Sequence, residues 1–240
     1  MTNQRPLHTV PALTAEQMRE IDWVMVEDLH ITLVQMMENA GRSLADVAVR
    51  RFHPETVTVL AGPGGNGDGG LVAARHLANR GVTVEVSLVR AARDLQPVPA
   101  HQLDILTRTG ITVTDQPRPA ALVIDALLGY SLRGDPSGRT GELIDWANRS
   151  GCAILALDIP SGLDADTAVA ASPCITADAT VTLALPKVGL RNAGQVGQLY
   201  LADISVPPGA YHGLGVSVPA LFRDSPIIEL EYGDGVFRPI

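Results

Sequence analysis

Residues 56–70 read TVTVLAGPGGNGDGG, a run of β-branched and apolar residues followed at once by a glycine-rich segment. The run at 56–61 has the composition of a buried strand. The segment 62–70 holds six glycines in nine positions, which is more than a tight turn requires. A helical pattern follows at about 69–80. Together these features predict a strand, a loop and a helix N-terminus, where backbone N–H groups can bind a phosphate.

The same alternation of apolar strands and helices continues along the chain. Further strands are predicted at 82–89, 121–128, 153–159, 179–185 and 199–204, and further helices at 97–109 and 140–149. Two helices precede the first strand, one starting at Thr14 and one over about 32–51. Continuous apolar strands that alternate with helices are typical of a parallel sheet covered on both faces. The predicted fold class is therefore α/β, a three-layer α/β/α sandwich with two N-terminal helices.

The length of 240 residues fits one domain over 1–240, with its core at about 14–208. From Pro207 onward the chain is punctuated by proline and glycine, which predicts a surface-hugging tail over 209–240. No run of about 18 uncharged apolar residues is present, so no membrane helix is predicted. The first residues, MTNQRPLHTVPALTAEQ, show no apolar segment of the signal-peptide kind.

Composition narrows the classes of function. Hydrophobic residues make up 46% and charged residues 18%, which excludes wholesale disorder. A net charge of −8 with scattered arginines argues against a nucleic-acid surface. The two cysteines, Cys152 and Cys174, are too few and too far apart for a metal site or a disulfide framework, so a reducing cytoplasm is expected.

Three unusual segments follow predicted strands. They are the glycine-rich loop, Asp125 with the loop 129–135, and Asp158 with the turn that leads to Ser161. Because ligands bind beyond the carboxyl ends of parallel strands, these segments are expected at one site. Asp158 stands before Pro160 on a stiff turn, which suits a positioned acid–base group. The oxygens of Asn66, Asp125 and Ser161 form a donor set for a hard cation, and a single carboxylate favours a monovalent ion.

Other interpretations of these segments are weaker. The spacing Gly62-x-Gly64-x-x-Gly67 matches a dinucleotide fingerprint, but an acid at the end of the next strand is missing, since Glu85 falls mid-strand and Arg90 ends it. No Lys-Ser/Thr follows the loop, which excludes a Walker A motif. Ser161 is not in a GxSxG elbow, which argues against a serine hydrolase. Lys187, the only lysine, follows a strand and either meets a phosphate or caps the strand end.

Several motifs in this order resemble one known family. They are QMMENAGRSLA, the glycine-rich loop with LVAARHL, VIDALLGYSLRG, ALDIPSGLDADT, ADATVTLALPKVGL and LYLADISVP. The chain thus resembles the NAD(P)H-hydrate epimerase family, the YjeF N-terminal domain, over about residues 14–208. The resemblance implies a Rossmann-like sandwich, a homodimer, and interconversion of R- and S-NADHX and NADPHX in cofactor repair. It also implies a separate dehydratase that restores NAD(P)H, for which this chain is too short.

Carried over by position, the resemblance makes Asp158 the catalytic carboxylate and implies a potassium site of Asn66, Asp125 and Ser161. It implies substrate contacts from Asp158 and from two loops, with the following residues: Gly65, Asn66, Gly67, Asp68, Gly69, Gly129, Tyr130, Ser131, Leu132, Arg133, Gly134 and Asp135.

The glycine-rich loop departs from the family pattern, which usually reads G-x-G-N-N-G-G-D-G. In this chain, Gly65 stands where the family pattern has its first Asn. Gly69 stands where the pattern has its Asp, and Asp68 lies one residue before that position. On a helix, one residue turns a side chain by about 100°. An active epimerase with a modified loop is favoured. A non-catalytic nucleotide-binding or scaffold protein of the same fold stays open, as does, with less support, an NADP-dependent oxidoreductase.

Overall fold

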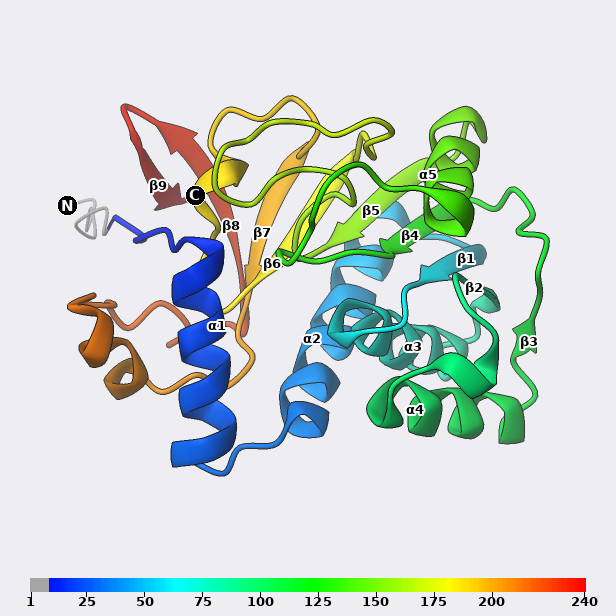
Figure 1. Cartoon of the computed structure of the whole chain (residues 1–240), viewed down its shortest axis with the longest axis horizontal. Coiled ribbons are helices and arrows are strands. Elements are labelled where there is room, and N and C mark those ends of the chain that lie inside the picture. Colours follow the sequence, from blue (N-terminus) through cyan, green and yellow to red (C-terminus); the bar gives the residue numbers. More distant parts are fainter. Residues whose placement is uncertain (1–8) are drawn as a thin grey trace, which may run out of the picture.

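The structure, a computed structural model, describes residues 9–240 and is built on a single nine-stranded sheet (Figure 1). The strand order is β3-β2-β1-β4-β5-β6-β7-β8-β9. Strands β1 to β7 are parallel, as predicted, and β8 and β9 are antiparallel. Their bounds are β1 Thr56–Ala61, β2 Thr83–Leu88, β3 Thr112–Val113, β4 Leu122–Ala126, β5 Ala153–Leu157, β6 Ala179–Leu183, β7 Gln198–Ala202, β8 Ile227–Gly233 and β9 Val236–Pro239.

Helices cover both faces of the sheet, which confirms the three-layer α/β sandwich. The bounds are α1 Ala15–Trp23, α2 Leu33–Val47, α3 Gly65–Ala78, α4 Pro97–Arg108 and α5 Gly138–Arg149. Helices α2, α3 and α4 contribute to the larger apolar core, whereas α5 packs on the other face in a second core with β4 and β5. Short π-helical turns follow α1 and α2, at Val24–Asp28 and Ala48–Phe52. Three 3-10 turns lie in the loops, at Ala92–Asp94, Val188–Leu190 and Pro208–Leu214.

Both N-terminal helices begin where the sequence predicts. The hydroxyl of Thr14 accepts a hydrogen bond from the backbone N–H of Gln17, whose side chain accepts one from the N–H of Thr14, a complete capping box. Thr32 and Gln35 form the same box at the start of α2. These caps fix where α1 and α2 start, and both helices contribute residues to the cavity described below.

Helix α3 starts earlier than its pattern predicts, at Gly65 rather than about 69. Glycine disfavours a helix by about 1 kcal/mol relative to alanine, so propensity alone places these residues in a loop. Close packing explains the difference, because a Cβ on Gly67 would lie 1.8 Å from the carbonyl oxygen of Gly62. A Cβ on Gly70 would lie 2.5 Å from that of Ala126. The glycines thus let α3 approach the strand ends closely.

The prediction of a surface-hugging tail from Pro207 is wrong for its last part. Strands β8 and β9 form a hairpin that extends the sheet beyond β7. Phe237 is buried in the main core and its ring lies 5.0 Å from that of Tyr232, centroid to centroid. Residues 228–232, Ile-Glu-Leu-Glu-Tyr, alternate as a half-buried strand does, and Asp234-Gly235 is a two-residue hairpin turn. The prediction follows the proline and glycine content of the tail and misses this local signal.

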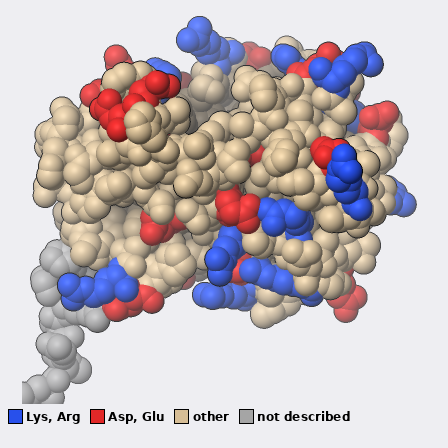
Figure 2. Space-filling model, turned by 90° about the horizontal axis from the view of Figure 1, so that it is seen from below, with Lys and Arg blue, Asp and Glu red and all other residues tan. Residues whose placement is uncertain are grey.

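Charged side chains of both signs lie next to one another on the face seen from below in Figure 2. Arg75 of α3 pairs with Glu38 of α2, and Arg80, just after α3, pairs with Asp46 of α2. Within residues 9–240, no helix is long and apolar enough to cross a bilayer. The sequence start, where no signal-type segment is predicted, falls partly in residues 1–8, outside the described residues.

Candidate active site

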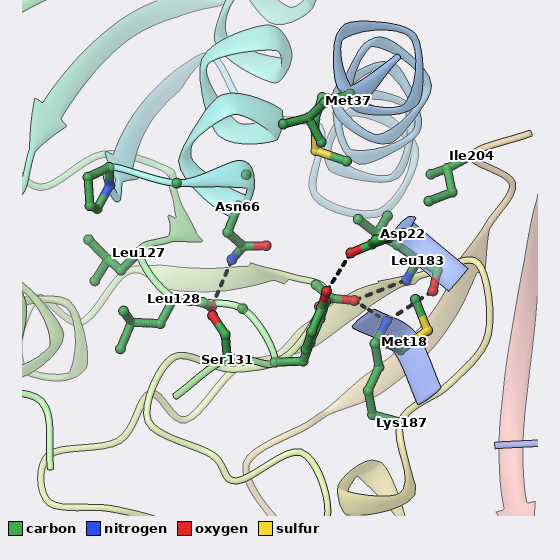
Figure 3. Close-up of a pocket in the computed structure, with 17 residues that line it drawn as sticks. Met18, Asp22, Met37, Asn66, Leu127, Leu128, Ser131, Leu183, Lys187 and Ile204 are labelled. Carbon is green, nitrogen blue, oxygen red and sulfur yellow. Dashed lines mark hydrogen bonds and ion pairs between the residues drawn. The ribbon is translucent and has the colours of Figure 1, made fainter. Parts of the chain in front are cut away.

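A cavity of about 390 Å³ lies beyond the carboxyl ends of β1, β4, β5 and β6 (Figure 3). The chain moves outward on one side from β1 and on the other from β4, so the gap between these strands is the switch point of the sheet. We call this space the strand-end cavity. Its lining comes from α1, α2, the start of α3 and the segments at the ends of five strands, β1, β4, β5, β6 and β7: Met18, Asp22, Leu33, Met37, Pro63, Gly64, Gly65, Asn66, Leu127, Leu128, Gly129, Tyr130, Ser131, Asp158, Leu183, Lys187 and Ile204.

The structure brings only part of the predicted substrate-contact set to this cavity. Six of its residues line the cavity, namely Gly65, Asn66, Gly129, Tyr130, Ser131 and Asp158. Gly67, Asp68 and Gly69 are buried within α3 and do not line it. The distal part of the second loop, Leu132, Arg133, Gly134 and Asp135, lies outside the lining. There Asp135 accepts a hydrogen bond from the backbone N–H of Ser172 at 3.0 Å.

Asp158 directly follows β5 and has a φ of 68°, in the left-handed region. Asp and Asn tolerate this conformation better than most side chains. Its backbone N–H bonds the carbonyl of Val181 at 2.7 Å, and its Oδ1 accepts the N–H of Leu183 at 3.4 Å. Its Oδ2 lies 3.6 Å from where a Cβ on Gly129 would be. The carboxylate is therefore held against β6 with its second oxygen near the loop that lines the cavity.

Lys187 forms a buried ion pair with Asp158, through Nζ and Oδ1. The lysine side chain is 1% exposed, and its ammonium also donates to the carbonyl of Leu183 at 3.0 Å. Of the two interpretations that the sequence leaves open for this residue, the strand cap is met in part, since Leu183 is the last residue of β6, and the ion pair with Asp158 is not predicted. Its being the only lysine of the chain, placed just after a strand, is the signal that could have found it.

The three residues of the predicted cation site lie together. Ser161 donates to Asp125 through its hydroxyl at 2.6 Å and its backbone N–H at 2.8 Å. The amide of Asn66 donates to the carbonyl of Leu128 at 2.8 Å, and the Ser161 hydroxyl lies 3.3 Å from that same carbonyl oxygen. Burial raises the pKa of Asp125 to about 6, and the hydrogen bonds that this carboxylate accepts from the Ser161 hydroxyl and from backbone N–H groups offset part of that rise.

A second pair of titratable groups in the strand-end cavity joins Tyr130, a predicted substrate contact, to Asp22, which the sequence analysis does not predict. The hydroxyl of Tyr130 donates to Asp22 Oδ2, which ties the loop after β4 to α1. Burial is the largest cause that raises the pKa of each group. Asp22 lies more than 100 residues from Tyr130 in the sequence, and its place on α1 shows no motif, so no local pattern could have found this pair.

The residues behind the oxidoreductase alternative lie elsewhere. Glu85, in β2, bonds the guanidinium of Arg118 at 2.5 and 2.8 Å and its backbone N–H at 2.8 Å. Arg90, at the strand end, is exposed and does not line the strand-end cavity. Neither residue is therefore placed to recognise the 2′-OH or 2′-phosphate of a dinucleotide's adenosine ribose there.

Asp68, the carboxylate displaced by one position in the loop, is fully buried beside α2. Among the described residues, neither of its oxygens has a hydrogen-bond partner. Burial, with a smaller contribution from the charge of Glu38, raises the pKa of Asp68 to about 7. At the next position, a Cβ on Gly69 would lie 2.7 Å from Leu157 and 3.8 Å from the sulfur of Met37, which lines the cavity. The one-residue shift thus puts the carboxylate off the cavity.

We expect Asp68→Asn to stabilise the folded protein at alkaline pH. Because the folded pKa is raised above its ordinary value of 3.8, the carboxyl favours folding when protonated, and that contribution is lost as the pH rises from about 4 through about 7. The variant should therefore be more stable than wild type by about 4 kcal/mol at pH 8, with a much smaller difference near pH 4. Urea unfolding at both pH values measures this, with exposed Asp28→Asn as the matched control. Equal stability at pH 8 would contradict it.

Known proteins resemble this chain both in sequence and in fold. A family model described as YjeF-related protein N-terminus matches residues 33–189. The chain is 43% identical over 216 residues to a protein of Dehalogenimonas lykanthroporepellens named NAD(P)H-hydrate epimerase, covering 86% of this chain and 87% of that protein. It is 39% identical over 215 residues to the bifunctional NAD(P)H-hydrate repair enzyme of Hyperthermus butylicus, covering 83% of this chain but 39% of that protein.

A solved structure shows the same fold. The crystal structure of the yeast protein ynu0 superposes with a TM-score of 0.80 at 23% identity, covering 92% of this chain and all of that one. Family model, relatives and fold agree with the motifs at the strand ends, so the chain belongs to the YjeF-related N-terminal family.

Proposed function

We propose that this protein interconverts the R and S epimers of NADHX and NADPHX, the hydrated forms of NADH and NADPH. The observation that carries the proposal is the carboxylate of Asp158 in the strand-end cavity, beside the N-terminus of α3. This chain matches most of the length of several relatives that are named NAD(P)H-hydrate epimerase. Their name supports the same assignment.

The start of α3 suits the pyrophosphate of such a substrate. The first backbone bond of the helix runs from the N–H of Asp68 to the carbonyl of Gly64, so the preceding N–H groups have no partner within the helix. Gly64 and Gly65 line the cavity, and no atom lies within 4 Å of where their Cβ atoms would be. An anion can therefore approach these N–H groups and the positive end of the helix dipole.

Asp158 is placed to move the proton that epimerisation requires. Hydration of the dihydropyridine ring puts a hydroxyl on the carbon next to the ring nitrogen, and inversion there needs that carbon to lose and regain one bond. In our proposal, the carboxylate of Asp158 takes the hydroxyl proton as the ring C–N bond opens and returns it on reclosure. Lys187 holds Oδ1, which leaves Oδ2 for the substrate.

A potassium ion fits the group formed by Asn66, Asp125 and Ser161. All three offer oxygen atoms, the single carboxylate is fully buried, and the groups that donate to it are neutral. Bound there, the ion would supply one positive charge that offsets Asp125 and draws the start of α3 toward the loop after β4. The proton transfers assigned to Asp158 do not pass through it.

The bifunctional name of the Hyperthermus butylicus protein, of which this chain matches about two fifths, suggests a linked second activity. We infer that a separate dehydratase consumes the S epimer made here, and that the enzyme acts as a cytoplasmic homodimer.

A coupled assay tests the proposal. The R epimer of NADHX is supplied with an S-specific dehydratase, and NADH recovery is followed at 340 nm with and without this protein, in potassium and in choline buffer. We expect faster recovery with the protein, and a larger effect in potassium because the ion orders the site. Equal rates in both buffers would contradict the ion's role.

The same assay separates the epimerase from a nucleotide-binding scaffold. The displaced Asp68 favours the scaffold, since it removes a carboxylate from the family's usual place. No acceleration in either buffer, with NADHX still bound in calorimetry, would replace the epimerase by the scaffold.

A further inference from the structure

We propose that Asp22 is a second catalytic residue of the strand-end cavity, the acid that works with Asp158 as base. The inference rests on the proposed epimerase activity and deepens it, because it assigns the other half of the proton transfer. It stands on the placement of two carboxylates in one cavity with partners of opposite character.

Asp22 and Asp158 reach the cavity from different elements. Asp22 comes from α1 and Asp158 from the end of β5, and both line the cavity (Figure 3). Asp158 is paired with the ammonium of Lys187, whereas Asp22 accepts a hydrogen bond from the neutral hydroxyl of Tyr130. One carboxylate is thus neutralised by a cation and the other is not, which is the arrangement that separates a base from an acid.

The surroundings of Asp22 favour its protonated form. Burial raises the pKa of Asp22 most, and the Asp158 charge adds to that, while the Tyr130 hydroxyl and the Lys187 charge offset part of it. The buried phenol of Tyr211, in the 3-10 turn at Pro208–Leu214, also interacts electrostatically with Asp22. On α1 itself, the positive charge of Arg19 lowers the pKa of the Tyr130 phenol and so offsets part of its rise. An acid that keeps its proton closer to neutral pH can donate it there.

The chemistry balances with these two groups. Asp158 takes the proton of the hydroxyl, the carbon–nitrogen bond breaks, and its electron pair goes to the ring nitrogen as the carbonyl forms. Asp22 gives its proton to that nitrogen. After rotation of the open chain, the nitrogen attacks the other face of the carbonyl, Asp22 regains the proton and Asp158 returns the other to oxygen. No oxidant, reductant or further reactant is needed.

Three variants test the assignment in the coupled assay, each with kcat, KM and a pH profile from 5.5 to 9. Asp22→Asn keeps an oxygen that accepts the Tyr130 hydroxyl but has no proton to give. We expect its kcat to fall about 100-fold with KM within about threefold of wild type. Any fall of kcat with rising pH that reports loss of the Asp22 proton should be absent in this variant. Tyr130→Phe should lose less than about tenfold, and exposed Glu20→Gln on the same helix should match wild type.

The outcomes separate this inference from the proposed function. An active wild type with Asp22→Asn at more than a third of its kcat overturns the role of Asp22 and leaves the epimerase standing. A loss in Tyr130→Phe as large as in Asp22→Asn also overturns it, since the bond between them would then be what matters. An inactive wild type overturns the proposed function itself.

Discussion

Asp158→Asn is expected to lower kcat for epimerisation by about 10²- to 10⁴-fold, the usual worth of a positioned acid–base group. Asparagine tolerates the left-handed backbone of this position, and its Oδ1 can still accept the hydrogen bond from the N–H of Leu183. We therefore expect the local geometry to be retained. What the substitution removes is the oxygen that takes a proton. KM should change little, because the proposed contacts to the substrate phosphates lie at α3.

A structural loss could imitate this result, because the variant leaves the Lys187 ammonium buried without its counter-charge. Removing one partner of a buried pair typically costs about 3–5 kcal/mol of stability. The double variant with Lys187→Met removes both charges and keeps a side chain of similar length. We expect it to recover most of the thermal stability while staying inactive.

The measurement is kcat in the coupled assay beside Tm by circular dichroism for wild type, Asp158→Asn and the double variant. Low activity with a restored Tm in the double variant assigns the loss to chemistry. A double variant that is folded and within tenfold of the wild-type kcat would contradict the role given to Asp158.

The regular part of the fold follows from local patterns in the sequence. Apolar runs such as 56–61 become the central parallel strands. Because such strands end at one edge of the sheet, the pattern alone predicts that Asn66, Asp125, Asp158 and Ser161 lie together. The capping residues of α1 and α2 act within four residues, so they too can be recognised locally.

The remaining features depend on contacts between distant segments. Asp22 reaches the cavity through the packing of α1 against the end of the sheet, where Leu13, just before α1, pairs with Lys187. The early start of α3 depends on backbone packing around Gly62 and Gly67, which overrides helix propensity. Strands β8 and β9 form because β7 offers them an edge. Of these features, only the β8–β9 hairpin has a periodic signal in the sequence, in the alternation of residues 228–232 before the turn at Asp234-Gly235.

Among alanine substitutions of the glycines in the first turn of α3, we expect Gly67→Ala to destabilise the protein most. The added Cβ would lie 1.8 Å from the carbonyl oxygen of Gly62 and 2.6 Å from its carbon, both of them backbone atoms. Backbone cannot rotate away as a side chain can, so α3 must move off the strand ends. We expect a loss of more than about 4 kcal/mol of unfolding free energy, or failure to fold.

Gly65→Ala is the matched control, two positions earlier in the same turn. No atom lies within 4 Å of its Cβ position, so the methyl group meets open space and only the gain in helix propensity remains. That variant should gain up to about 1 kcal/mol. Urea unfolding of both variants measures the contrast, and since propensity favours alanine equally at the two sites, any difference between them comes from packing. A Gly67→Ala protein as stable as Gly65→Ala would mean that the contact between Gly62 and Gly67 does not hold α3 against the sheet.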